Sequence, residues 1–164
     1  MRISILSNVN MDMLAGLLKK DHEIHLISGY GGWISCALRP DPELSRFDPE
    51  CLLLLLDGNE LLRRCGSLQE QREELRQYPS ARLLVSTIDV TPDLIRAGDD
   101  ADDSAAAAAY WEECLSKLTE EHGNLHRFEL RNLIADYGRR QFYSDRFWYM
   151  GSIPYYMKAL HMLA

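Results

Sequence analysis

The stretch Cys51-Leu-Leu-Leu-Leu-Leu-Asp57-Gly58-Asn59 decides the fold of this chain. Six apolar residues in a row, preceded by Pro49 and followed by Asp57 and Gly58, are typical of a strand whose two faces are both covered by helices. Asp57–Asn59 then follows the carboxyl end of that strand, and ligands bind at this edge of parallel α/β sheets. The stretch therefore predicts a parallel sheet and one of its functional loops.

Strand-like and helical patterns alternate on both sides of this stretch. Apolar runs predict four further strands, and helical spacing of apolar residues predicts helices between and after them. The order predicts a three-layer α/β/α domain with a five-stranded parallel sheet, formed as a single domain by residues 1–164. The strands are expected at 2–8, 23–28, 51–56, 82–87 and 125–130, and the helices at 11–20, 59–78, 104–122 and 154–163, with Pro154 in the first turn of the last.

Composition narrows the class of protein. The 164 residues carry 25 acids against 18 bases, a net charge of −7, and an acidic surface repels phosphate backbones, so nucleic acid is not an expected partner. No apolar run reaches the length of a membrane span, and the N-terminus lacks the pattern of a signal peptide. The four cysteines form no C-x-x-C pair, which excludes a disulfide scaffold or a zinc knuckle. We expect a cytoplasmic protein without a metal or other cofactor.

The strand ends nominate five loops for a binding site. These are residues 7–10, 29–33, 57–59, 86–89 and the segment around Asp145. Phosphate-binding and nucleophile-elbow motifs (G-x-x-x-x-G-K-[ST], G-x-G-x-x-G and G-x-S-x-G) are all missing. Ser7 or Asn8 is expected at the sheet edge, as a nucleophile or an oxyanion donor, whereas Asn10 suits the N-cap of the following helix. No histidine falls in these loops, so a serine–histidine pair is not evident.

Three segments resemble the N-terminal region of FkbH-like proteins, a haloacid dehalogenase subfamily. The first is residues 38–56, LRPDPELSRFDPECLLLLL, and the second is the opening ILSNVNMDML at residues 5–14. The third is the ending, with YGRR at 137–140, DR at 145–146, WY at 148–149 and IPY at 153–155. The resemblance covers nearly the whole chain. It implies an SGNH-hydrolase-like fold, placed before a haloacid-dehalogenase-like domain, in the loading of glyceryl-type acyl units onto a carrier protein in polyketide-type biosynthesis.

The same resemblance implies roles for individual residues. Ser7 stands where the SGNH serine follows the first strand, although no Gly-Asp-Ser is present. Asp145 keeps the acid of the D-x-x-H motif, but Trp148 replaces its histidine, which removes the base that would deprotonate serine. The D-x-D-x-[TV] motif of the phosphatase-like half is missing. Substrate-binding positions are then expected at Asn8, Asn10, Gly29, Gly31, Gly32, Trp33, Asp57, Asn59, Arg146 and Trp148.

Three functions remain open. The first is a catalytically degenerate SGNH-like domain that binds an acyl or phosphorylated small molecule, or an acyl carrier protein. In that case Arg139, Arg140 and Arg146 are candidates to bind a phosphopantetheine or substrate phosphate. The second is an active acyltransferase or esterase whose nucleophile is Ser7 or Cys36, since Cys51 is expected to be buried. The third is a flavodoxin-like interaction module without small-molecule chemistry.

Overall fold

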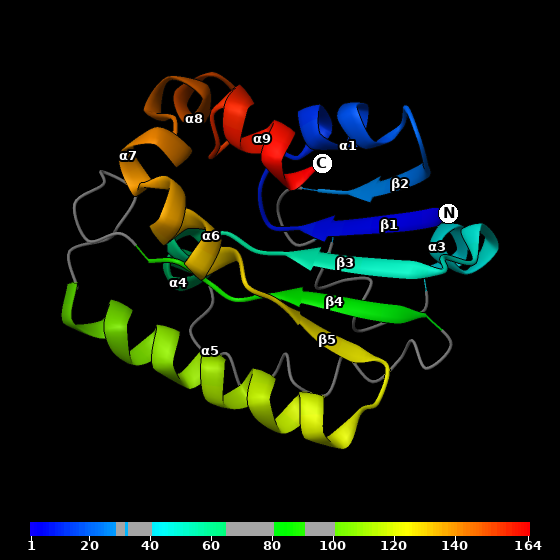
Figure 1. Ribbon diagram of the computed structural model, residues 1–164, viewed down its shortest axis with the longest axis horizontal. Coiled ribbons are helices and arrows are strands. Elements are labelled where there is room, and N and C mark those ends of the chain that lie inside the picture. The colour runs from blue at the N-terminus through cyan, green and yellow to red at the C-terminus, as the bar shows by residue number, and fades with distance from the viewer. Residues whose placement is uncertain (29–31, 33–40, 65–80, 91–100) are drawn as a thin grey trace.

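The computed structural model describes residues 1–28, 32, 41–64, 81–90 and 101–164. Within them, five parallel strands form one sheet in the order β2-β1-β3-β4-β5 (Figure 1). The strand order confirms the predicted parallel α/β fold. The strands are β1 (Arg2–Ser7), β2 (Glu23–Ile27), β3 (Cys51–Leu55), β4 (Arg82–Ser86) and β5 (Leu125–Phe128).

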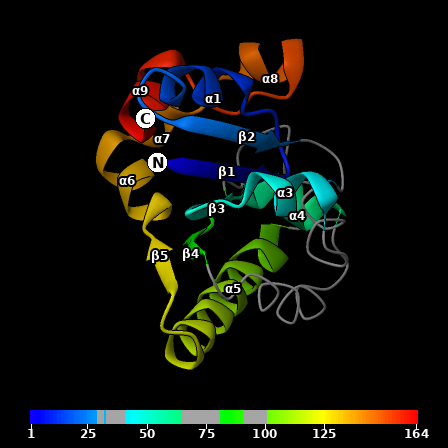
Figure 2. The ribbon, with the colours of Figure 1, turned by 90° about the vertical axis from the view of Figure 1, so that its right-hand side faces the viewer.

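Helices cover both faces of the sheet, and β3 is apolar at every position. The helices are α1 (Asp12–Leu18), α3 (Pro42–Phe47), α4 (Gly58–Arg64), α5 (Ala101–Glu121), α6 (Leu130–Tyr137), α7 (Arg139–Phe142), α8 (Asp145–Gly151) and α9 (Met157–Leu163). Leu52 and Leu54 belong to the apolar cluster under α3, α4 and α5, whereas Leu55 belongs to the cluster under α1, α6, α7 and α9. In Figure 2, α6, α7 and α9 lie on the left of the strands and α3, α4 and α5 on the right.

The structure corrects the predicted elements before β3, at the end of β5 and at the start of the last helix. The segment expected to be a loop before β3 contains α3, whose first turn is capped by the Asp41 carboxylate through the backbone N–H groups of Glu43 and Leu44. The fifth strand ends at Phe128, since Leu130 already begins α6. The last helix begins at Met157 rather than Pro154. Of the helix expected at 59–78, only α4 lies within the described residues.

A small antiparallel bridge sets α8 apart from the layers. Tyr143 bridges Tyr155, and the Ser144 N–H donates to the Pro154 carbonyl oxygen at 2.8 Å, so α8 is an excursion between two adjacent points. Phe142, fully buried, contacts both of those tyrosine rings edge-on and anchors the base of the excursion. The helix itself has no buried residue. As a result, α8 stands on the surface with its aromatic side chains partly exposed.

No helix in the described part of the chain is both long and apolar enough to cross a bilayer.

Candidate functional site

The strand order places a topological switch point between β1 and β3. The chain leaves β1 toward β2 on one side and reaches β3 on the other, and ligands bind to open α/β sheets at the crevice this reversal creates. Ser7 pairs with Leu55 in the last register of the two strands. The residues that follow, Asn8 and Asp57, therefore line the crevice.

The Asn8 side chain spans this crevice. Its Nδ2 donates to the Asp57 carbonyl oxygen at 2.9 Å, and its Oδ1 accepts from the Asp57 backbone N–H at 2.8 Å. We call these two contacts the Asn8–Asp57 bridge. Both residues are buried. The bridge continues the β1–β3 hydrogen-bond ladder through a side chain, and it uses the polar groups of the Asn8 amide that were expected to face a substrate.

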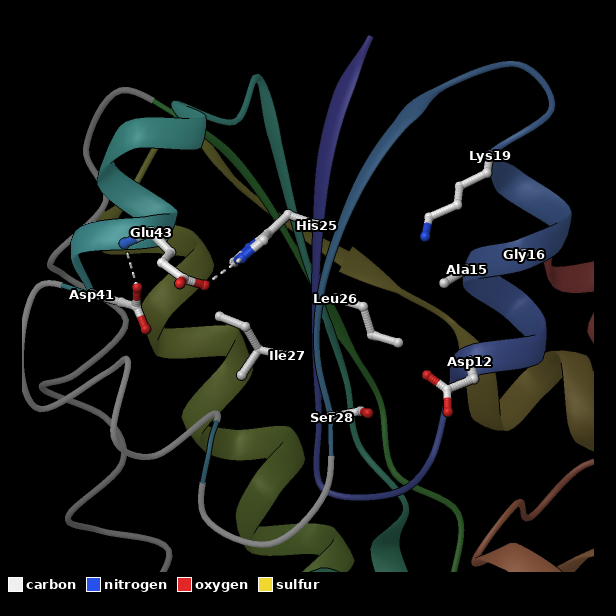
Figure 3. A pocket seen from close by; sticks show the side chains of 10 residues that line it. All are labelled: Asp12, Ala15, Gly16, Lys19, His25, Leu26, Ile27, Ser28, Asp41 and Glu43. Atoms are coloured by element: carbon white, nitrogen blue, oxygen red, sulfur yellow. Dashed lines mark hydrogen bonds and ion pairs between the residues drawn. The ribbon is translucent and has the colours of Figure 1, made fainter.

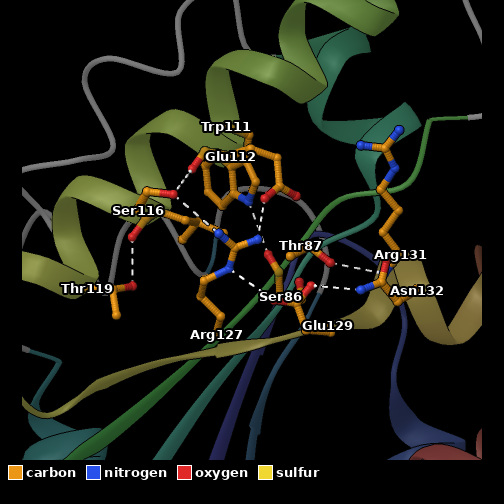
Figure 4. Close-up of polar contacts among 11 residues, drawn as sticks. Ser86, Thr87, Trp111, Glu112, Ser116, Thr119, Arg127, Glu129, Arg131 and Asn132 are labelled. Carbon is orange, nitrogen blue, oxygen red and sulfur yellow. Dashed lines mark hydrogen bonds and ion pairs between the residues drawn. The ribbon is translucent and has the colours of Figure 1, made fainter.

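The other strand ends are held in the same way, by short polar side chains on backbone groups. The Ser86 hydroxyl oxygen accepts from the Leu56 N–H at 3.0 Å, which ties β4 to the end of β3. The Thr87 hydroxyl oxygen accepts from the Arg131 N–H at 2.9 Å, which ties β4 to α6 (Figure 4). The Trp111 indole N–H on α5 donates to the Ser86 carbonyl oxygen at 3.0 Å. Buried backbone groups at this edge thus find protein partners.

The Asp57-Gly58-Asn59 turn starts α4 and packs against the end of β4. Asp57 Oδ1 accepts from the Glu60 N–H at 2.9 Å, as an N-cap does. A Cβ on Gly58 would lie 2.4 Å from the Asp89 carbonyl oxygen, so only glycine fits there. Asn59 is buried behind this turn. The Asp57 side chain therefore serves the start of α4.

Asp89 is a buried carboxylate that the sequence analysis placed in a candidate loop but did not pair. Arg139 donates to it from Nε at 3.1 and 3.0 Å and from Nη2 at 2.7 Å, and the Tyr143 hydroxyl donates at 3.2 Å. The Asp89 contact raises the pKa of Arg139. Burial raises the pKa of the Tyr143 phenol well above 10, and the nearby Tyr155, Asp57 and Asp89 raise it further. This group holds α7 against the end of β4.

Ser7, the expected nucleophile, lies at the end of β1 with no exposed surface. Its Oγ accepts from the Val9 N–H at 3.3 Å, a local turn contact. No imidazole is hydrogen-bonded to it: the five histidines are His22 before β2, His25 in β2, His122 after α5, His126 in β5 and His161 in α9. In the described part of the chain, Ser7 therefore has neither a hydrogen-bonded imidazole nor access from solvent.

The remaining predicted residues fall into three groups. Asn10 is half-exposed and its Oδ1 accepts from the Asp12 N–H at 2.9 Å, but the N-cap position of α1 is Met11, so Asn10 stabilises the turn before the helix instead of capping it. Asp145 and Arg146 are exposed on α8, whereas Trp148 packs against the α1–α9 cluster. Gly32 is half-exposed, with Ile27 3.1 Å from where its Cβ would lie. Gly29, Gly31, Trp33 and Cys36 lie outside the described residues.

The structure does not gather these predicted residues into one open site. Ser7, Asn8, Asp57 and Asn59 meet at the C-terminal edge of the sheet, while Asp145 stands on the exposed helix. Cys51 is buried as expected, and burial raises the pKa of its thiol. No group of three or more His, Cys, Asp or Glu side chains in the described ranges is arranged to hold a metal ion.

Comparison with known proteins gives a structural neighbour but no family. No protein-family model matches the sequence, and no curated protein matches it. The fold is similar to the crystal structure of the N-terminal part of the protein BF1531 from Bacteroides fragilis, which contains a phosphatase domain complexed with Mg. The TM-score is 0.77 at 16% sequence identity, and the match covers 99% of this chain and 49% of that one. This chain therefore spans about half of the neighbour's length, and the similarity establishes the fold alone.

The Asn8–Asp57 bridge makes a prediction for stability. Replacing Asn8 with Ala leaves the buried Asp57 N–H without its partner, whereas the Asp57 carbonyl oxygen still accepts from the Leu61 N–H at 3.0 Å. We expect a loss of about 1–3 kcal/mol in the free energy of unfolding for the one buried N–H that becomes unsatisfied, measured by urea denaturation at one protein concentration. The control is Asn10→Ala, which removes one contact at a half-exposed position. A loss for Asn8→Ala no larger than that of the control would show that the bridge contributes little.

Proposed function

We propose that this chain is a non-hydrolytic, SGNH-like binding domain of the FkbH-like kind, which serves an acyl carrier protein or a small acyl or phosphorylated molecule in natural-product biosynthesis. The observation that carries the proposal is the closed polar edge of the sheet, where Ser7 is fully buried and no imidazole is hydrogen-bonded to it. A serine nucleophile needs a base to remove its proton near neutral pH. Without one, binding rather than acyl transfer is the activity that this fold can retain.

The exposed face of α8 supports docking of an acidic protein. Arg146, Tyr149 and Met150 are spaced i, i+3 and i+4, so they share one face of the helix. Tyr149 is 68% and Met150 72% exposed, and Arg146 is exposed beside them. Tyrosine, methionine and arginine are enriched at protein interfaces. A carrier protein with an acidic recognition surface and an apolar patch would match this face.

Of the three arginines considered for anion binding, Arg139 is already engaged. Its guanidinium is bidentate on the buried Asp89 carboxylate. Arg140 and Arg146 are exposed, on α7 and α8 respectively, and the proposal therefore rests on these two. A phosphorylated carrier arm or substrate would be held there by charge-assisted hydrogen bonds.

The structural neighbour supports a working arrangement with a second domain. Its crystal structure contains a phosphatase domain with Mg, and this chain matches 49% of its length. We propose that the present chain works beside a haloacid-dehalogenase-like domain in the same manner, and that the second domain carries the phosphoryl or acyl chemistry. The role of the present domain is then to bind and position.

The alternative function is an active esterase or acyltransferase that uses Ser7. A labelling experiment separates the two. The protein is incubated with a fluorophosphonate probe and, separately, with p-nitrophenyl acetate, with a known serine esterase as the positive control. We expect no labelling and no hydrolysis above the Ser7→Ala variant, because Ser7 has no base and no exposure. Labelling of the wild-type chain that is absent in Ser7→Ala would overturn the proposal and establish the esterase.

Carrier docking has its own test, by calorimetry or fluorescence anisotropy with an acidic acyl carrier protein. Arg146→Glu and Tyr149→Ala change exposed side chains on α8, so both variants should fold. We expect each to weaken binding by about tenfold, the effect of losing one interface contact of about 1.4 kcal/mol. The matched control is Arg131→Glu, an exposed arginine on α6, which should bind like the wild type. If Arg146→Glu and Tyr149→Ala bind the carrier protein as tightly as Arg131→Glu and the wild type, α8 is not the docking surface.

A further inference from the structure

The outer edge of β2 has no strand beside it in the described chain. The sheet order makes β2 a terminal strand that pairs with β1 only. The Glu23 N–H donates to the Met1 carbonyl oxygen at 3.1 Å, so Glu23 faces β1. Backbone groups alternate in direction along a parallel strand, which places the N–H and C=O of Ile24 and Leu26 on the outer side. These groups can form a new ladder.

A groove of about 590 Å³ surrounds this edge (Figure 3). Helix α1 forms one wall and the start of α3 the other, with the end of β2 between them. The His25 side chain lies against the α3 wall. Its ring stacks on that of Phe47 with 5.4 Å between the ring centroids, and its Nε2 lies 4.0 Å from Glu43 Oε2. Gly16 on α1 has no atom within 4 Å of where a Cβ would be, so this wall is open.

The opposite edge of the sheet, at β5, differs from the β2 edge because it carries a charged side chain with several partners. On β5, Arg127 forms ion pairs with Glu112 of α5 and with Glu129, and the Arg127 guanidinium also donates to the Ser116 hydroxyl (Figure 4). Charged side chains of this kind discourage edge-to-edge pairing. The stretch from Ile24 to Ile27 has no lysine, proline or bulge and is only half-buried. It keeps the features of a strand that accepts a partner.

Two side chains of opposite charge lie at opposite ends of β2. Lys19, directly after α1, lies beside the start of β2, and Asp12, the first residue of α1, lies beside its end (Figure 3). Neither side chain forms an ion pair with another described residue. A twofold axis at the middle of β2 exchanges its two ends. It therefore brings Lys19 of one copy opposite Asp12 of the other, twice over.

We propose that two copies of this chain pair antiparallel along β2, about a twofold axis at His25, to form one continuous sheet. In that register, Ile24 of one copy is hydrogen-bonded to Leu26 of the other, so all four outward backbone groups of each strand segment are used. The groove walls of the two copies meet across the axis, with two Lys19–Asp12 contacts on the α1 side. Each copy has a net charge of −7, and Asp41 and Glu43 on the α3 wall add to the repulsion between copies, so the two Lys19–Asp12 contacts fix the register of the pair and the backbone ladder holds it together.

A charge swap tests the pairing by sedimentation equilibrium of the full chain. The wild type should be dimeric. Lys19→Asp and Asp12→Lys each place like charges opposite one another at both contacts, and we expect about tenfold weaker association for each. The double variant carrying both changes restores the opposite charges and should return the affinity to the wild-type value. Lys20→Asp, the same charge change at an exposed position outside the groove, is the matched control and should leave the dimer intact.

A second pair of variants tests the backbone ladder. Leu26→Pro removes an outward N–H and Leu26→Ala does not, although both lose the leucine side chain. With far-UV circular dichroism showing that both variants fold, only Leu26→Pro should be monomeric. The proposal is overturned if the wild-type chain stays monomeric up to its solubility limit. It is equally overturned if the wild type dimerises, but the double charge variant does not recover the wild-type affinity and Leu26→Pro remains dimeric.

Discussion

The structure depends on satisfying backbone hydrogen bonds where β1 and β3 part. Two parallel strands that end side by side leave N–H and C=O groups without a strand partner, and burying such groups unpaired costs about 1–3 kcal/mol each. Asn8 meets this constraint because its amide offers one donor and one acceptor, which match the carbonyl and N–H of Asp57. Ser86 and Thr87 repeat the solution for the neighbouring backbone groups. The C-terminal edge is therefore built from side chains that bind the protein's own backbone.

This constraint bears directly on function. In other proteins with open α/β sheets the crevice between such strands receives a ligand, and here the Asn8–Asp57 bridge spans it. The buried Asp89 carboxylate, bound by Arg139 and Tyr143, secures the helices that follow β5 instead of facing solvent. The surface features of the described chain lie elsewhere, on α8 and along β2. A domain of this kind is suited to holding partners, which agrees with the binding role that we propose.

The fold could be predicted from the sequence because its signal is local. A run such as Cys51–Leu56 fixes a strand covered on both faces, and the predicted strands and their parallel order are confirmed within a residue or two at each end. Helix α3 was missed because six residues of mixed polarity carry little periodicity. Of the four helices after β5, only α9 was predicted. Helix α6 was missed because its start was assigned to the fifth strand, and α7 and α8 are short helices without clear apolar spacing.

The site was harder to predict because its contacts join distant residues. Asp89 and Arg139 are 50 positions apart, and nothing in either local sequence marks the pairing. The Asn8–Asp57 bridge joins two loops that were both nominated, but an asparagine after a strand suits an oxyanion donor as well as a backbone partner. Only the position of Asp57 in space shows which of these two roles Asn8 takes. The tight fit of Gly58 against the Asp89 carbonyl is likewise a property of packing and not of the motif.

The most direct test of the account is amide hydrogen exchange at the switch point, followed residue by residue by NMR. The account holds that the crevice between β1 and β3 is closed in the native state. The amides of Leu56 and Asp57, which donate to Ser86 and Asn8, should then exchange as slowly as those in the middle of β3, through opening close to global unfolding. Fast exchange of these two amides, with β3 itself protected, would show a crevice that opens and would contradict the account.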